Sequence, residues 1–254
     1  MKKPAPSGSN DPRWTGDPQC RGGRVAFFGG SFDPPHLGHL AVARAAREAL
    51  GLDRVLFAPV GAQPLKPEGS TAPFPDRLAM TELAIAGETG FEISLADVPS
   101  AGGQPNYTLE TLHKLRAGLS ESGCLFCLMG ADSFAGLRRW HGAERIPFVA
   151  SIVVASRPGQ DLNHLACCLP EGLALGSPSA KEQEDSRGTI ELRSYLIRNP
   201  AGETAPFYIL PDLDVEISAS DIRSQIRSSS REAAVSQSLP VRVADYIRMR
   251  GLYR

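Results

Sequence analysis

The stretch RVAFFGGSFDPPHLGHLAVARAAREALGL, from Arg24 to Leu52, decides the fold of this chain. An apolar run typical of a short strand ends on the pair Gly29 and Gly30. Two prolines follow, and then a helical pattern that ends at Gly51, a residue type common just after a helix. A strand, a glycine turn and a helix in this order predict the first unit of a parallel sheet covered by helices.

The same stretch carries two histidines behind the glycine turn. His36 and His39 are three residues apart, so on a helix they share one face. Glycine lets a ligand approach the main chain, and a helix N-terminus attracts anions, so we expect a phosphate site here. Near a phosphate the rings would favour the protonated form, which donates from both nitrogens. Two core histidines or a metal pair are the alternatives, but no carboxylate or cysteine ligand stands nearby for a metal.

The rest of the chain repeats this rhythm. Strand patterns cover 54–60, 91–98, 124–130 and 151–158, and helical patterns cover 75–87, 107–119 and 132–140. This alternation predicts an α/β fold with a doubly wound, Rossmann-like parallel sheet and helices on both faces. Such sheets bind their ligands at the carboxyl ends of the strands.

The organisation predicts one domain over residues 24–254, preceded by a disordered tail over 1–23 that is rich in Pro, Gly and Ser. Residues 159–205 interrupt the rhythm with turn formers, a charged run and a strand pattern at 189–198. This pattern predicts one long insertion, either a hairpin or a mobile segment. The core resumes at 207–211, and two C-terminal helices are expected at 218–229 and 240–251.

Composition narrows the class of protein. The 254 residues are 42% hydrophobic and carry a net charge of −1, which gives no basic field for nucleic acid. No run approaches the ~18 apolar residues of a membrane span, and no secretory signal is evident, so we expect a cytoplasmic protein.

The five cysteines are then expected to be free thiols. Cys124 and Cys127 lie three apart on a strand and face opposite sides, so they cannot clamp one metal ion.

A second phosphate-binding pattern follows the insertion. In ISASDIRSQIR (217–227), Ser218 precedes Asp221 with the spacing of a capping box, and Arg223 and Arg227 share a helix face. A helix N-terminus with an arginine suits phosphate, although a capped surface helix with solvated arginines fits as well.

Three further segments carry candidate side chains. Gly130 and Asp132 end an apolar strand, where a carboxylate can accept from ribose hydroxyls. Trp140 is able to stack on an aromatic ring or to belong to the core. Lys66, in the loop QPLKP (63–67), is within reach of a phosphate or is a solvated charge.

Together these segments resemble bacterial nicotinate-nucleotide adenylyltransferases of the HxGH nucleotidyltransferase superfamily. P-loop, GxGxxG and GxSxG motifs are missing, which disfavours the enzymes that depend on them. The resemblance rests on GGSFDPPHLGHL (29–40), NYTLETL (106–112), GADSFAGLRRW (130–140), SRPG (156–159), ISASDIR (217–223) and VADYIRMRGLY (243–253).

The resemblance implies adenylyl transfer from ATP to nicotinic acid mononucleotide, assisted by Mg²⁺, which yields deamido-NAD and pyrophosphate. It implies catalytic roles for His36, His39, Arg223 and Lys66. It implies ATP binding by Gly29, Gly30, Ser31, Phe32, His36, His39, Gly130, Asp132, Ile217, Ser218, Ser220 and Arg223. It implies nicotinate-nucleotide binding by Tyr107, Thr108, Trp140 and Lys66, with no metal ligand from the chain. The loop departs from the family pattern, because Leu65 stands where a histidine is usual.

Other functions stay open at this point. The acceptor could instead be nicotinamide mononucleotide, phosphopantetheine or FMN. A protein of another class, a non-catalytic nucleotide-binding module, is a further alternative; the loss of either histidine would favour it, and both are present. A tRNA-handling enzyme is disfavoured, because the chain has no basic stripe. Neither nucleic acid nor membrane is an expected partner, and a homo-oligomer is left open.

Overall fold

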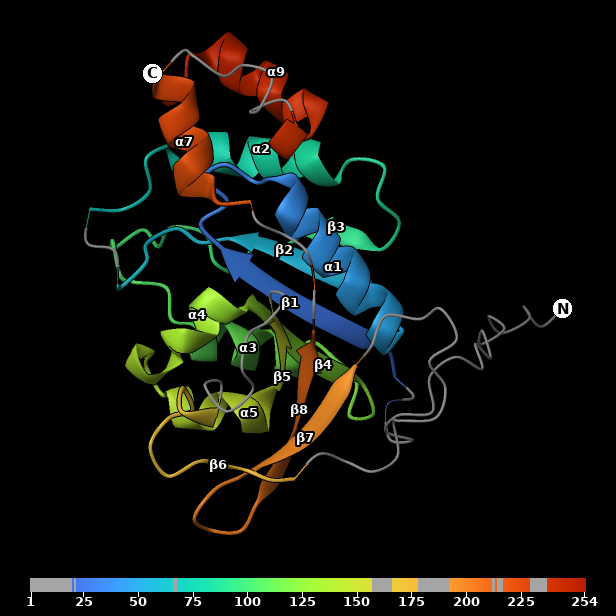
Figure 1. Cartoon of the computed structure of the whole chain (residues 1–254). Helices are drawn as coiled ribbons and strands as arrows, with labels where there is room; N and C mark the ends of the chain where they lie inside the picture. The colour runs from blue at the N-terminus through green and yellow to red at the C-terminus, as the bar shows by residue number, and fades with distance from the viewer. Residues whose placement is uncertain are drawn as a thin grey trace, which may run out of the picture.

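The computed structural model describes residues 20, 22–65, 68–156, 166–177, 192–211, 213, 217–228 and 237–254 (Figure 1). Within these residues, eight strands form one sheet in the order β3-β2-β1-β4-β5-β8-β7-β6. They are β1 (Arg24–Gly30), β2 (Arg54–Pro59), β3 (Phe91–Ile93), β4 (Cys124–Gly130), β5 (Ser151–Ala155), β6 (Ala174–Leu175), β7 (Arg193–Arg198) and β8 (Thr204–Leu210).

The sheet is doubly wound, as predicted. From β3 across to β8, all neighbouring strands pair in parallel. The chain runs outward from β1 to β2 and β3, and then returns to β4 on the other side of β1. This reversal leaves a crevice above the carboxyl ends of β1 and β4, where open α/β sheets place their ligands.

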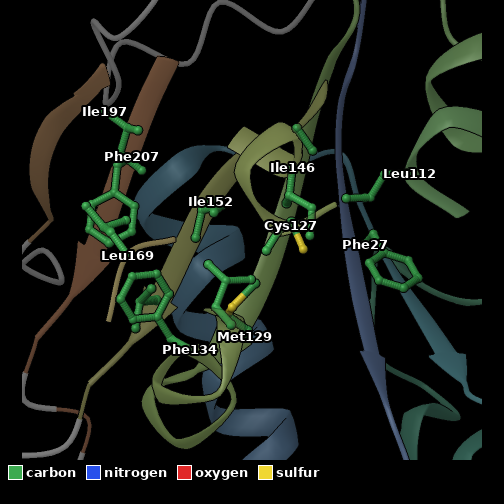
Figure 2. Close-up of a cluster of buried hydrophobic side chains, with 14 of the residues drawn as sticks. Phe27, Leu112, Cys127, Met129, Phe134, Ile146, Ile152, Leu169, Ile197 and Phe207 are labelled. Carbon is green, nitrogen blue, oxygen red and sulfur yellow. The ribbon is translucent and has the colours of Figure 1, made fainter. Parts of the chain in front are cut away.

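Helices cover both faces of the sheet (Figure 1). On one face lies α1 (Leu37–Leu50), which buries Leu40, Ala43 and Ala46 against strand residues at helical spacing. The other face carries α3 (Thr108–Ala117), α4 (Ala131–Ala135) and α5 (Ile146–Val149). Figure 2 shows the core beneath them, formed by side chains such as Phe27, Cys127, Met129, Phe134, Ile152 and Phe207.

Three helices pack beside the sheet into a small third cluster. They are α2 (Phe74–Ile85), α7 (Ala219–Arg227) and α9 (Val241–Arg250), and they gather at one end of the molecule (Figure 1). Their shared core includes Met80, Ile222, Val243 and Ile247. The buried carboxylate of Asp76 joins α2 to α9, because it accepts from the hydroxyl of Tyr246 at 2.8 Å and from Nε of Arg250 at 3.1 Å.

Two predicted elements are shorter than expected. The strand pattern at 91–98 is a strand only to Ile93, because the chain then bends and the Asp97 carbonyl accepts from the Gly61 N–H instead of a sheet neighbour. The helix expected over 132–140 breaks at Gly136 into α4 and the 3₁₀ turn η1 (Leu137–Arg139). A second 3₁₀ turn, η2 (Ala143–Arg145), leads into α5, which the sequence patterns did not predict.

The insertion contributes to the sheet where the structure describes it. β7 and β8 form an antiparallel hairpin, and β6 adds to β7 in the antiparallel sense. The hairpin turns at Asn199–Gly202, where Gly202 has a φ of 85°. Residues 157–165 and 178–191 lie outside the described part of the chain, so the one-domain division and the extent of the insertion stay predictions.

The expectation of five free thiols is wrong. Cys20 forms a disulfide with Cys124, across a sequence separation of 104 residues. The backbone explains this pairing, because Gly22 donates to the Ser122 carbonyl at 2.9 Å and Cys124 donates to the Gly23 carbonyl at 2.8 Å. These bonds place the two Cα atoms 5.4 Å apart, within the range that a disulfide spans. The described part of the chain therefore includes Cys20, Gly22 and Gly23, which lie within the segment 1–23 assigned to the tail.

The remaining cysteines are free thiols, with Cys127 and Cys168 buried and Cys167 exposed. Cys124 and Cys127 pack toward opposite faces of the sheet, as their spacing predicted. Among the described helices, none is both long and apolar enough to span a membrane.

Candidate functional site

Two cavities adjoin at the carboxyl ends of β1 and β4. The first, the histidine cavity, encloses about 530 Å³ and contains His36, His39 and Arg223 in its wall. The second, the tryptophan cavity, encloses about 670 Å³ beside Trp140. Their walls share Gly29, Gly30, Gln63, Met129, Asp132 and Ser133. Two ligands could therefore meet over the glycine turn and the start of α4.

The two histidines lie at the beginning of α1, stacked on each other. His36 is the N-cap with extended backbone, one residue earlier than the predicted helical position, and His39 is in the first turn. Their ring centroids are 3.7 Å apart. The N–H of His36 donates to Nδ1 of His39 at 3.2 Å, which leaves the proton of a neutral His39 ring on Nε2. His39 is therefore set up as a hydrogen-bond donor at Nε2.

Burial keeps these rings neutral. It lowers the pKa of His36 from 6.5 to about 4. Burial also lowers the pKa of His39 well below its usual value, and the neighbouring His36 lowers it further. The protonated form expected from sequence is thus not the form that the protein itself favours, because both rings lack a carboxylate partner among the described residues. Nδ1 of His36 is buried and has no hydrogen-bond partner in the described part of the chain.

Glycines line the wall between the two cavities. A Cβ at Gly29 would lie 2.6 Å from the ring of Phe27, so only glycine fits against that core side chain. Gly130, on the neighbouring strand, has no atom within 4 Å of an added Cβ, so this backbone is open to a ligand. Phe32, after the turn, has a φ of 46°, which is rare outside glycine and marks a strained loop beside the site.

The helix α7 brings its arginine to the histidine cavity from far along the chain. Nη1 of Arg223 donates to the carbonyl of Asp33 at 2.6 Å, and Nη2 donates to Oγ of Ser220 at 3.1 Å. Ser218 is the N-cap, but its side chain makes no capping bond, which differs from the predicted capping box. Ser218 instead belongs to the cavity wall. The imidazole pair and the distant arginine helix therefore surround one space.

Aromatic and polar groups line the tryptophan cavity. Tyr107 and His141 lie with ring centroids 4.6 Å apart, beside Thr108 and Trp140. Arg139 is the one Lys or Arg among the described residues of this wall. Asp97 is buried there and accepts from the Thr111 hydroxyl, and burial raises the pKa of its carboxyl.

The residues assigned from sequence fall into these two walls. All twelve residues assigned to ATP line the histidine cavity, and Tyr107, Thr108 and Trp140 line the tryptophan cavity. Lys66 lies outside the described residues, as do residues 157–159 of the SRPG segment. Leu65, which stands in place of the usual loop histidine, is about half exposed and lines the tryptophan cavity.

Sequence patterns missed the side chains that hold the loop of the site. Arg77, Asp33 and Tyr253 are buried and bond to that loop or to each other. Asp33 stands inside the quoted stretch, but its partners are too distant in sequence for a local pattern to reveal them. Arg139 and His141 flank the predicted Trp140, and a search for charged neighbours of that tryptophan could have found them.

The chain offers no ready-made metal centre in its described part, where no three His, Cys, Asp or Glu side chains cluster. Asp132 is exposed and lies in the wall shared by both cavities, so an acidic residue stands where a ligand-borne cation could be bound. Magnesium commonly takes most of its ligands from substrate phosphates and water, with one or two carboxylates from protein. These residues fit a magnesium ion that arrives with a nucleotide.

Comparisons with known proteins identify the family and the fold. The family model described as cytidylyltransferase-like matches residues 27–225. A probable nicotinate-nucleotide adenylyltransferase of Thermomicrobium roseum is 35% identical over 91% of this chain and 92% of its own length. Another from Stenotrophomonas maltophilia is 39% identical over 90% of this chain and 96% of its own. The nicotinic acid mononucleotide adenylyltransferase of Plasmodium falciparum, solved in complex with NaAD, matches with a TM-score of 0.63 at 13% identity. That match covers 91% of this chain and 97% of the other, and it supports the fold.

Proposed function

Because the chain belongs to the cytidylyltransferase-like family and is similar to nicotinate-nucleotide adenylyltransferases over about nine-tenths of its length, we propose that it transfers the adenylyl group of ATP to nicotinic acid mononucleotide. The products are deamido-NAD and pyrophosphate, and the reaction belongs to NAD biosynthesis. The observation that carries this proposal is the meeting of two cavities, one with phosphate-binding groups and one with an aromatic wall, over Gly29 and Gly30.

The reaction needs alignment and charge neutralisation rather than a covalent side chain. An oxygen of the acceptor phosphate attacks the α-phosphorus of ATP, and the bond from that phosphorus to the bridging oxygen breaks, so pyrophosphate leaves with the electron pair. The acceptor phosphate is already a nucleophile. The protein therefore has to hold the two phosphates in line and stabilise the negative charge that builds on the oxygens.

The residues of the histidine cavity supply those contacts. His36 and His39 contact the triphosphate, and the fixed Nε2–H of His39 donates to the phosphoryl group in transfer. Ser220 and Arg223 hold the ATP phosphates at the beginning of α7, where the helix dipole adds to the positive charge. Gly130 and Asp132 contact the adenosine part, and the sequence resemblance assigns a phosphate contact to Lys66. Magnesium bound with ATP supplies further charge neutralisation on the phosphates.

The tryptophan cavity holds the pyridine nucleotide in this proposal. Trp140 and Tyr107 stack against the nicotinate ring, and Thr108 offers a hydrogen bond beside it. Arg139 supports an acid rather than an amide acceptor, because a cation in this wall stabilises a carboxylate and gains nothing from a neutral amide. We propose a cytoplasmic location for the protein, in which the Cys20–Cys124 disulfide is an exception to the reduced thiols usual in that compartment.

A substrate panel tests this function. The full chain is incubated with Mg²⁺-ATP and nicotinic acid mononucleotide, nicotinamide mononucleotide, FMN or phosphopantetheine, and pyrophosphate release is measured. We expect the fastest release with the acid mononucleotide. Equal rates with acid and amide would contradict the acid preference, and no release with any acceptor would indicate a non-catalytic binding module.

The same panel tests the part assigned to Arg139. Arg139→Gln should narrow the acid-to-amide ratio of kcat/KM by about tenfold, the order of one charge-assisted contact. Arg138→Gln is the matched control, because this neighbouring arginine donates to the Leu169 carbonyl and is absent from both cavity walls. An unchanged ratio in Arg139→Gln would show that the selection is made elsewhere.

A further inference from the structure

The second-last residue of the chain reaches back to the loop of the active site. Tyr253 is 6% exposed, and its hydroxyl donates to Oδ1 of Asp33 at 2.8 Å across 220 residues of sequence. The buried Asp33 carboxylate also accepts from the backbone N–H of Thr71 at 2.6 Å and of Ala72 at 3.0 Å. The C-terminus is thus part of the polar network behind the catalytic loop.

Side chains from outside the loop hold residues 31–36 in place. Arg77 of α2 donates to the Ser31 carbonyl at 2.7 Å, and Arg223 of α7 donates to the Asp33 carbonyl at 2.6 Å. Tyr253 is the partner that holds the side chain of Asp33 from the C-terminus. Because the loop carries a residue at a φ of 46°, Phe32, its shape depends on such external bonds.

This loop leads directly into His36, three residues after Asp33, where α1 begins. Loop and helix both hold the His36 backbone, because its carbonyl accepts from the His39 N–H at 2.9 Å and its own N–H donates to Nδ1 of His39 at 3.2 Å. A displacement of Asp33 would therefore be passed through His36 to both imidazoles.

We propose that Tyr253 is a positioning residue for adenylyl transfer, and this inference rests on the proposed function. Its hydroxyl fixes Asp33, Asp33 fixes the loop 31–36, and the loop sets the imidazole pair against the α-phosphate of ATP. Tyr253 touches neither substrate, since it is absent from the walls of both cavities. Its effect therefore belongs to the transfer step and not to acceptor binding.

The chain contains a close control for this bond. Tyr246, on α9, also donates its hydroxyl to a buried carboxylate at 2.8 Å, that of Asp76. The bond joins α9 to α2 and does not involve loop 31–36. Tyr253→Phe and Tyr246→Phe each remove one oxygen and one hydrogen bond, so a purely structural role predicts the same consequences for both.

The experiment measures kcat, both KM values and Tm for the full chain and the two variants. We expect Tyr253→Phe to lower kcat about tenfold, with the KM for the mononucleotide within about twofold, because a small misplacement of reacting groups affects the transfer step most. Tyr246→Phe should keep kcat within about twofold while losing a similar amount of Tm. An equal loss of kcat in both variants would overturn the positioning role.

A mutant cycle asks whether the effect passes through the imidazole pair. In the background that lacks both rings, His36→Ala with His39→Ala, Tyr253→Phe should change kcat by less than about twofold, because the rings that it positions are gone. The same tenfold loss in both backgrounds would contradict the proposed path. If the wild-type chain releases no pyrophosphate, the proposed function fails before any variant is compared, so the two failures are distinguishable.

Discussion

At the scale of single residues, the site divides two tasks between imidazole and guanidinium. The stacked rings of His36 and His39 are held neutral by burial, so they can offer directed N–H donors with no charge to desolvate. Arg223 is a guanidinium in the wall of the same cavity. In the proposed function, direction comes from the histidines and charge from the arginine, which suits a reaction that moves negative charge without forming a covalent intermediate.

Removing the directed donor should slow the transfer step. His39→Ala is expected to lower kcat by roughly 10²-fold or more, the effect of losing one donor to transition-state charge. The KM for the mononucleotide should change little, because His39 lines only the histidine cavity. Steady-state pyrophosphate release measures both parameters, and near-normal kcat would refute the role.

Acid should destabilise the fold through the buried ring of His36. Its pKa is about 4 in the folded chain against 6.5 as the ordinary value. Between these values the unfolded chain binds the extra proton, so this contribution to stability is complete above pH 6.5 and is lost as the pH falls toward 4. The loss is about 3 kcal/mol for one such ring. Urea unfolding at several pH values measures it, and His36→Ala should flatten the slope in this window; an unchanged slope would contradict the explanation.

At the scale of elements, the N-termini of α1 and α7 meet at one cavity although they are far apart in sequence. The fold achieves this by placing α1 after β1 in the centre of the sheet and by packing α7 with α2 and α9 beside it. Arg223 then joins α7 to the loop ahead of α1 through the carbonyl of Asp33. The arrangement explains why a carrier of negative charge would bind between the two helices.

The planar fork of Arg223 should matter more than its charge. Arg223→Lys keeps the charge but cannot reach the Asp33 carbonyl and the Ser220 hydroxyl together, so we expect kcat/KM for ATP to fall about tenfold or more. Arg227→Lys is the control, because this exposed arginine lies one turn further along α7 and outside both cavity walls. Equal effects of the two changes would assign the loss to α7 as a whole.

At the scale of the whole molecule, the disulfide and the site occupy opposite ends of the same strand. Cys124 begins β4 and Gly130 ends it, which places them about 20 Å apart at the rise of a strand. The Cys20–Cys124 bond anchors the chain ahead of β1 to the amino end of the sheet. The disulfide should therefore stabilise the fold without affecting the reaction.

Reduction of the Cys20–Cys124 disulfide should lower the stability of the fold without changing the activity. Breaking a bond that closes 104 residues is expected to lower the stability by about 3 kcal/mol, and Tm by about 5–10 °C, while kcat stays unchanged. Cys20→Ser should reproduce the effect, and Cys167→Ser, at an exposed free thiol, should not. Thiol titration of the denatured chain should count three groups without reductant and five with it. An unchanged Tm would refute the stabilising role.

The sequence predicted most of what local patterns can encode. Strand, glycine turn and helix periodicities led to the doubly wound sheet, and the assigned phosphate-binding residues line one cavity because parallel strands bring their carboxyl ends together. The bonds of Arg77 and Tyr253 to the site loop have no local signature, since they join residues that are distant in sequence. The partner of Cys124 was missed for the same reason. Burial also reversed the expected protonation of the histidines, and burial depends on the complete fold.

The common wall of the two cavities has a consequence for inhibitors. A single molecule with an adenosine group at one end and a pyridine at the other would occupy both spaces across Gly29 and Gly30. Once one end is bound, the other is held at a high effective concentration beside its own half of the site. Such a two-headed ligand should compete with both substrates at once, and the dinucleotide product, which has this shape, should restrain its own synthesis as it accumulates.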